Sequence, residues 1–155
     1  MINFLLHIIV SSLTFIMGLA LSLLFYYQNQ WPAYYEAQAR GSLRQIVMAQ
    51  TLYSVTKGKG KFTDLQTLGR EGLISPDLAS GQKDGYLFTC EPILVKGNPP
   101  LFDAMAKPIR SGLFRSGYRS YYSSEIFILW ERYGTEPPRA TVEDRKPKDC
   151  FVSND

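Results

Sequence analysis

The chain begins with a long apolar run that carries no charge. Residues 4–25 are FLLHIIVSSLTFIMGLALSLLF, and the first charged side chain of the sequence is Glu36. As a helix, this run would be about 33 Å long, which is enough to cross the hydrocarbon core of a bilayer. The pattern therefore predicts a transmembrane helix near the N-terminus.

Aromatic residues gather at the C-terminal end of the run, where membrane proteins place rings at the headgroup level. They are Phe25, Tyr26, Tyr27, Trp31, Tyr34 and Tyr35. We therefore predict that residues 1–31 form a transmembrane segment with an aromatic interface belt. A signal peptide would have a basic start and a nearby small-residue cleavage site. The one site with that spacing, at residues 37–39, is about a dozen residues too far along, so we expect the segment to be retained.

One face of the predicted helix carries small and weakly polar residues at steps of three and four. They are Asn3, His7, Ser11, Thr14, Gly18 and Ser22. Such a stripe lets a second helix approach closely, because helices associate in lipid through packing and hydrogen bonds. We predict that it packs against an integral membrane protein complex. The alternative is that Ser and Thr bond only to carbonyl groups of their own helix.

His7 is the only histidine of the chain. A histidine within a membrane is a candidate ligand for a haem or a pigment such as chlorophyll. However, His7 lies near the membrane edge, where water reaches it, which favours an interfacial or helix-contact role. No other residue suggests a cofactor, and we predict none.

Helical periodicity continues beyond the membrane, and strand-like patterns follow it. Apolar residues recur at helical spacing until glycines end the pattern near residue 58, so the helix would rise about 46 Å above the bilayer. Alternating or aromatic runs at residues 86–90, 101–106 and 125–130 predict strands. A long helix followed by an antiparallel sheet is an α+β fold, in which the sheet covers the apolar side of the helix.

Four stretches of the chain follow one another in a particular order. They are Ser42-Leu43-Arg44-x-Ile46-x-x-Ala49-Gln50-x-x-Tyr53, Phe62-Thr63-x-Leu65-x-x-Leu68-Gly69-x-x-Gly72-Leu73-Ile74, Leu78-Ala79-Ser80-Gly81-x-Lys83-x-Gly85-Tyr86-x-Phe88-Thr89 and Gly117-Tyr118-Arg119-Ser120-Tyr121-Tyr122-Ser123. Over residues 39–124 this order resembles the globular domain of type IV pilin-like proteins and type II secretion pseudopilins. The resemblance implies a long N-terminal helix, a connecting loop and a three- or four-stranded antiparallel sheet outside the cytoplasmic membrane. We therefore expect residues 32–133 to form a pilin-like domain.

The first residues depart from that family. Prepilins have a basic leader, a glycine before the cleavage point and a glutamate near the start of the membrane helix. Residues 1–20 have no acidic or basic side chain other than His7, and Gly18 is followed by Leu-Ala. A glutamate in lipid is costly unless it meets a neighbour's amino terminus, so without it a reason to polymerise is missing. We expect a pilin-like domain retained as a fixed membrane subunit.

The two cysteines, Cys90 and Cys150, belong to no zinc, redox or haem motif. A disulfide between them would close a loop of about 60 residues and contribute roughly 4 kcal/mol in the chain-entropy model. We predict this bridge, with two free thiols as the alternative. Because disulfides persist in oxidising compartments, the bridge would place the domain in the periplasm and the N-terminus in the cytoplasm. Arg40 and Arg44 after the span favour the opposite orientation, although a domain of this size can be translocated regardless.

The C-terminal tail, residues 134–155, contains three prolines and mixed charges and is predicted to be extended. Its charged residues are expected to form a self-neutralising surface: Arg139, Glu143, Asp144, Arg145, Lys146 and Lys148.

Two further surfaces are candidates for contact. We expect the KGKGK segment, with Lys57, Lys59 and Lys61, to be a solvated loop, and the alternative is a docking site for an acidic partner. Tyrosine and arginine are common interface anchors, so a further candidate surface comprises Arg115, Tyr118, Arg119, Tyr121 and Tyr122. Strand packing would explain these residues equally well.

The composition of the chain limits the number of domains and the classes of function that it can have. The chain has 155 residues, of which 45% are hydrophobic and 20% charged, enough for one globular domain. Its soluble part has no histidine, no glycine-rich phosphate loop and no metal-ligand spacing, so we do not expect an enzyme. We expect lipid and protein partners, including a soluble protein docked on the outer domain, and no nucleic acid.

These patterns together predict a single-span accessory subunit of a larger complex in the bacterial inner membrane, with its domain in the periplasm. A respiratory or photosynthetic assembly is one such complex. The alternative is a minor pseudopilin of a type II secretion or type IV pilus machine.

Overall fold

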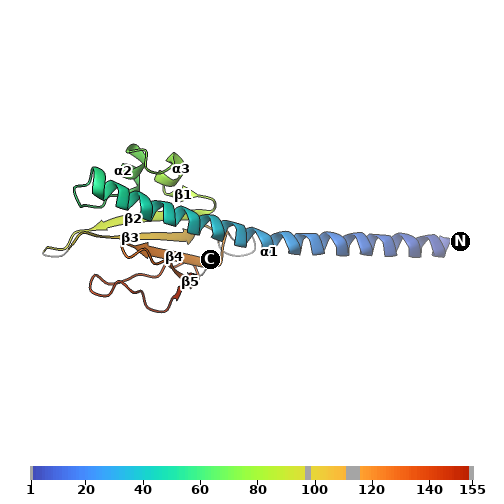
Figure 1. The fold of residues 1–155 in the computed structure, drawn as a ribbon. Coiled ribbons are helices and arrows are strands. Elements are labelled where there is room, and N and C mark those ends of the chain that lie inside the picture. Colours follow the sequence, from blue (N-terminus) through green and yellow to red (C-terminus); the bar gives the residue numbers. More distant parts are fainter. Residues whose placement is uncertain (1, 97–98, 111–115, 154–155) are drawn as a thin grey trace.

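The structure, a computed structural model, describes residues 2–96, 99–110 and 116–153. Within these residues, one long helix packs on a six-stranded antiparallel sheet, beside two short helices (Figure 1). Helix α1 spans Ile2–Thr56 and continues through Pro32. Its N-terminal half projects away from the rest of the chain, and its C-terminal half lies along the sheet. The predicted α+β layout of a helix on a sheet is confirmed, although the sheet has six strands where the resemblance implied three or four.

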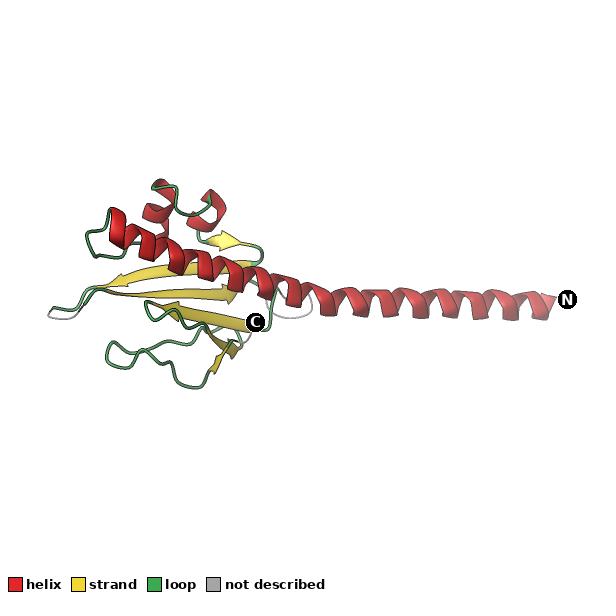
Figure 2. Cartoon of the chain, viewed as in Figure 1, coloured by secondary structure: helices red, strands yellow, loops and turns green. Residues whose placement is uncertain are grey.

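The sheet is a meander in which each strand pairs with the next along the chain (Figure 2). Its strands are β1 (Gln82–Lys83), β2 (Tyr86–Ile93), β3 (Leu101–Pro108), β4 (Arg119–Ser124), β5 (Trp130–Tyr133) and β6 (Phe151–Val152). Helices α2 (Leu65–Arg70) and α3 (Pro76–Ala79) lie between α1 and β1 in the chain. We call residues 32–153 the head, and we call its ends near and far according to their distance from the projecting half of α1.

The core lies between α1 and one face of the sheet. Leu43 and Ile46 on α1 are fully buried. Across from them, β2 and β3 pair Phe88 with Ala106 and Cys90 with Ala104, and these four residues belong to the same buried cluster. Side chains alternate between the two faces of a strand, so every second residue of β2 and β3 points toward α1. The small alanines of β3 leave room for the helix.

Gln50 ties the far end of α1 to the loop that follows it. Its Oε1 accepts a hydrogen bond from the Thr63 amide at 3.0 Å, and its Nε2 donates to the Thr63 carbonyl and to Cys90 Sγ. The side chain of Gln50 is fully buried, so these bonds satisfy both ends of an amide that water cannot reach. They fix the path of the chain from α1 toward α2.

The predicted strand at residues 125–130 is wrong. The strands are β4 and β5, and residues 125–129 connect them. The chain turns because the Phe127 amide donates to the Ser124 carbonyl at 3.0 Å, and Phe127 itself adopts a φ of 61°. Ile126, Phe127 and Ile128 are consequently exposed. The apolar run lies in the connection, whereas the residues paired in β4 are the tyrosines and serines before it.

The tail has one regular element that the sequence did not predict. Most of it is irregular, as expected, but β6 pairs with β5 by matching Trp130 to Val152 and Glu131 to Phe151. The Ser153 amide also donates to the Leu129 carbonyl at 2.8 Å. The tail therefore returns to the sheet and adds its last strand.

The burial of α1 makes a direct prediction for stability. We expect Leu43→Ala to lower the free energy of unfolding of the head by about 2–5 kcal/mol, because it leaves a cavity where the side chain is fully buried. Met48→Ala is the matched control on the same helix, since Met48 is 70% exposed. It should change the free energy by no more than about 0.5 kcal/mol. Urea unfolding in detergent measures both, and equal effects would contradict this packing.

Candidate functional site

Helix α1 is the one described helix that is long and apolar enough to cross a membrane. Its large apolar side chains are exposed along the projecting half, including Leu13, Phe15 and Ile16. Exposed apolar surface of this extent is expected of a segment whose solvent is lipid. The finding supports a single-span membrane protein, and the orientation of the span stays a prediction.

The predicted packing stripe lies on this open part of α1. His7, Ser11, Thr14, Gly18 and Ser22 are all exposed, and the side chain of Asn3 lies outside the described part. Thr14 Oγ1 donates to the Ser11 carbonyl and Ser22 Oγ donates to the Leu19 carbonyl, each at 2.9 Å. These two hydroxyls thus bond within their own helix, as the alternative interpretation expected. Close approach of a partner would then depend on small size, above all at Gly18, where an added Cβ would meet no atom within 4 Å.

The stripe and the head lie on the same side of α1. An α-helix has about 3.6 residues per turn, so residues about 25 apart, or seven turns, point in nearly the same direction. Gly18 and Leu43 are related in this way, and Thr14 and Gln50 are about ten turns apart. Because Leu43 and Gln50 face the sheet, Gly18 and Thr14 face the space below it. A helix packed on the stripe would lie under the near end of the head.

The near end is organised around Glu36 and Arg119. Glu36 is buried on α1, where Oε1 accepts from the Tyr118 amide at 2.7 Å and Oε2 lies 3.8 Å from Arg119 Nη1. Arg119 Nη2 donates to the Tyr133 hydroxyl at 2.9 Å, and Arg119 Nε lies 3.7 Å from Glu131. The bond to Tyr133 and the two carboxylates raise the pKa of Arg119 above its usual value. The guanidinium therefore stays charged and joins α1, β4 and β5.

A close contact at Tyr86 shapes the same end. Its hydroxyl donates to the Arg119 carbonyl at 2.9 Å, and burial raises the pKa of Tyr86 far above its ordinary value. A Cβ at Gly117 would overlap this hydroxyl oxygen, so the position has no room for a side chain. Tyr86 and Gly117 together hold the start of β4 against the core.

The predicted tyrosine and arginine surface is present only in part. Tyr118 is 38% exposed and Arg119 is half-buried, and both lie at the near end. Tyr121 and Tyr122 are fully buried, so their assignment to a surface is wrong, and strand packing accounts for them. Tyr122 donates its hydroxyl proton to Asp103 at 2.7 Å. Arg115 lies outside the described residues.

Two participants of the near end were not predicted. Tyr133 is 65% exposed and has its ring centre 4.9 Å from the Arg119 guanidinium. Glu36 had a usable signal in the sequence, because it lies in step with Ala39 and Leu43 on the apolar side of the helix. A carboxylate on a buried face needs a cationic partner. Tyr133 had no comparable signal.

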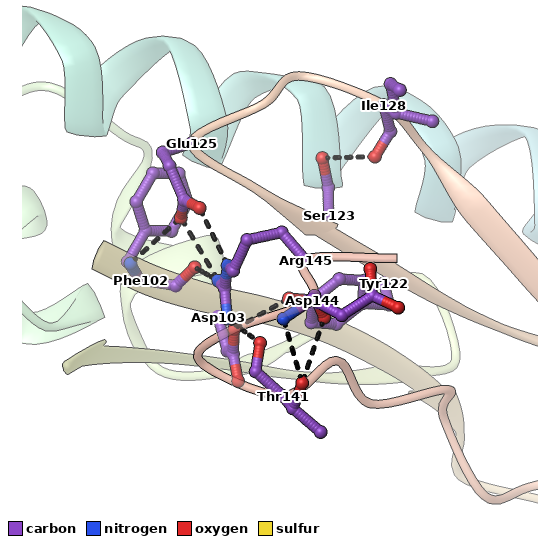
Figure 3. A network of polar contacts seen from close by, with 9 residues as sticks. All are labelled: Phe102, Asp103, Tyr122, Ser123, Glu125, Ile128, Thr141, Asp144 and Arg145. Atoms are coloured by element: carbon purple, nitrogen blue, oxygen red, sulfur yellow. Dashed lines mark hydrogen bonds and ion pairs between the residues drawn. The ribbon is translucent and has the colours of Figure 1, made fainter. Parts of the chain in front are cut away.

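Arg145 fastens the tail to the far part of the sheet (Figure 3). Its side chain is 11% exposed, which corrects its assignment to the self-neutralising surface. Arg145 Nε donates to Glu125 Oε1 and Nη2 donates to Asp103 Oδ1, each at 2.7 Å, and Nη2 also reaches the Phe102 carbonyl at 2.9 Å. Burial acts to lower the pKa of Arg145, and the bonds to Glu125 and Asp103 outweigh it and raise the pKa. One cation thus joins the tail, β3 and the turn after β4.

The predicted disulfide is not formed, and both cysteines are free thiols. Cys90 lies on the face of the sheet that packs against α1, whereas Cys150 packs beside Met105 and Trp130 on the opposite face. The sheet separates them. Burial raises the pKa of the Cys90 thiol to about 12. The disulfide argument for an oxidising compartment therefore no longer applies.

The described residues contain no group of three or more His, Cys, Asp or Glu side chains that could hold a metal ion. The serines of β4 have structural bonds: Ser120 Oγ donates to the Glu136 carbonyl at 2.8 Å and Ser123 Oγ to the Ile128 carbonyl at 3.0 Å. The arrangement offers surfaces for contact, and we identify no catalytic constellation within the described ranges.

Comparisons with protein-family models, with curated proteins and with solved structures each returned no match. The resemblance to pilin-like proteins therefore stays a prediction from the sequence.

Loss of the Arg145 cation should release the tail. Arg145→Met would leave Asp103 and Glu125 without their cation in a mostly buried site, so we expect a loss of about 3–5 kcal/mol in the free energy of unfolding. Trypsin should then cut the tail faster at its remaining basic residues. Lys148→Met is the control, because it removes an exposed tail cation that has no ion pair among the described residues. Similar cleavage rates for the two variants would refute the role of Arg145.

The two thiols should differ in reactivity. At pH 8, iodoacetamide should modify Cys150 well before Cys90, because Cys90 is buried and its raised pKa keeps it protonated. Cys90 should react once the protein is unfolded in urea. Mass spectrometry of the two peptides measures this order. A gel mobility that changes with reductant would instead indicate the disulfide that the structure lacks.

Proposed function

We propose that this chain is a non-enzymatic accessory subunit of a larger membrane protein complex. In this proposal α1 anchors it in the bilayer, and the head stands on the periplasmic side of a bacterial cytoplasmic membrane. The observation that carries the proposal is the shared direction of the stripe and the head on one continuous helix. A respiratory or photosynthetic assembly is a suitable parent complex.

The geometry of α1 supports a lateral partner. A helix packed on Gly18 would rise under the near end of the head, where Tyr118 and Tyr133 are exposed. The partner could therefore contact the subunit twice, once through lipid-embedded packing and once through an aqueous surface. Two weak contacts on one rigid body act together, because formation of the first raises the effective concentration for the second.

The orientation of the head follows from the resemblance alone. Pilin-like domains stand outside the cytoplasmic membrane, and the helix-on-sheet layout is consistent with that family. We retain the outward orientation on this ground, since the cysteines no longer support it. A soluble partner on the head would then be periplasmic.

A second candidate is a minor pseudopilin of a type II secretion or type IV pilus machine. It is favoured by the sequential antiparallel sheet beneath a long helix, which matches the layout that the resemblance implies. Intact mass of the protein purified from membranes separates the two candidates. Trimming near Gly18, or N-methylation, would favour the pseudopilin, whereas a retained apolar segment would favour the fixed subunit.

The proposed packing face can be tested with a matched pair of substitutions. We expect Gly18→Leu to lower the yield of co-purified membrane partner in mild detergent by about tenfold, because a large side chain keeps the partner helix at a distance. Ala20→Leu is the control, since two residues along a helix turn the side chain by about 200° to the other side. Quantitative mass spectrometry against wild type measures both yields.

The outcomes of this test are distinct. Unchanged yield with Gly18→Leu, or equal losses for both variants, would overturn the stripe as the contact.

The side of the membrane on which the head lies is measured separately with Gln66→Cys in a Cys150→Ser background, because Gln66 is exposed on α2. A membrane-impermeant maleimide should label it in intact spheroplasts. Labelling only after lysis would place the head in the cytoplasm.

A further inference from the structure

A cavity opens on the side of the sheet away from α1, between β5 and the tail. Its volume is about 480 Å³. The residues that line it are Arg132, Arg139, Thr141, Asp144, Lys146, Lys148 and Asp149. All but one of them come from the segment that Arg145 pins to β3, so the Arg145 network supports the wall of the cavity.

The lining is strongly basic. Four cationic side chains and two carboxylates surround the cavity, which leaves a net of two positive charges. Among the described residues, none of these four cations has a carboxylate within ion-pair distance. Other cations of the head do, namely Lys57, Lys83, Arg119 and Arg145. The cavity thus brings together four cations that have no carboxylate partner among the described residues, although other head cations, such as Lys59, Lys61 and Arg70, also have none.

Two of the cations are held in position. Arg132 Nε and Nη2 donate to the Glu136 carbonyl at 3.0 and 2.7 Å, which orients the guanidinium and uses two of its five N–H groups. Lys146 Nζ lies 5.9 Å from the centre of the buried Trp130 ring. The nearby carboxylate of Asp144 accepts from the Lys146 amide at 3.0 Å and so is partly engaged by the backbone. The remaining donors of Arg132 and Lys146 stay available to a ligand.

Like charges around one cavity repel one another, and an anion between them would relieve that repulsion. Charges near one another interact more strongly at a protein surface than in bulk water, because the effective dielectric is lower there. The volume falls within the range of about 300–1,000 Å³ that is typical of small-molecule sites. A net of two positive charges matches an anion with at least two negative charges. We propose that this cavity binds a small, multiply charged anion of the diphosphate class.

The proposal goes beyond the accessory-subunit function and does not depend on it. Titration calorimetry of the full chain in nanodiscs of neutral lipid, with pyrophosphate as the probe, tests it. We expect saturable binding at one site that weakens as salt is added. The triple variant Arg139→Gln, Lys146→Gln and Lys148→Gln should bind at least about tenfold more weakly, because it removes three attractive charges.

The control triple is Lys59→Gln, Lys61→Gln and Lys96→Gln. It removes the same charge from exposed positions that do not line the cavity, and it should leave the affinity within about twofold of wild type. Thermal unfolding of both triples should match wild type without ligand, since the substituted side chains are exposed.

Absence of saturable binding overturns the site, as does equal weakening in the two triples, which would indicate only a general charge effect. Binding of a polyglutamate peptide without binding of pyrophosphate overturns it too.

A further titration in nanodiscs that contain phosphatidylglycerol identifies the source of the anion. Competition with pyrophosphate would assign the site to lipid phosphates, and no competition would assign it to a soluble anion. Partner recovery with Gly18→Leu is measured independently, so failure of either proposal can be recognised.

Discussion

The structure depends on the packing of one face of α1 against the sheet. Leu43, Ile46 and Gln50 have no exposed surface, so the rotation of the helix about its own axis is fixed where it meets the head. Because α1 continues without a break to Ile2, that rotation also fixes the directions of the described side chains in the apolar half. The orientation of the membrane stripe is thus determined by contacts made some tens of residues away. In the proposed function, the packing of the head would therefore set which side of α1 meets a partner.

Charged networks then secure the two ends of the sheet. At the near end, Arg119 links Glu36 on α1 to Glu131 and Tyr133 on β5. In the far part, Arg145 links the tail to β3 and to the turn after β4. Both guanidinium groups are at least half-buried and contact two carboxylates, the geometry in which loss of one partner is most costly. The meander alone would leave β5 and the irregular tail weakly attached, so these cations complete the fold.

The sequence predicted the elements whose signals are local. The apolar run and its helical continuation are periodic, and two of the three predicted strands fall within β2 and β3, where burial alternates along β2. The third predicted strand, residues 125–130, was wrong because Ile126, Phe127 and Ile128 form an apolar run that is typical of a core strand. In the structure these residues are exposed in a turn, and the ion pair between Arg145 and Glu125 holds that turn in place. The partners of Arg145 lie 20 and 42 residues away, and no local pattern links them. The predicted disulfide between Cys90 and Cys150 was wrong for a related reason, since their separation along the chain does not show on which face of the sheet each cysteine will lie.

The uninterrupted length of α1 has a mechanical consequence. From the aromatic belt to its end at Thr56, the helix extends about 45 Å at 1.5 Å per residue, with the sheet rigidly attached to it. Membrane helices tilt by about 20° on average, and their tilt responds to bilayer thickness. A change of only about 10° would move the far end of the head sideways by about 8 Å, close to the distance between the axes of two packed helices. With α1 in a bilayer as proposed, the helix and its attached sheet would act as a lever, so that small changes of tilt within the lipid would give large displacements at the far end.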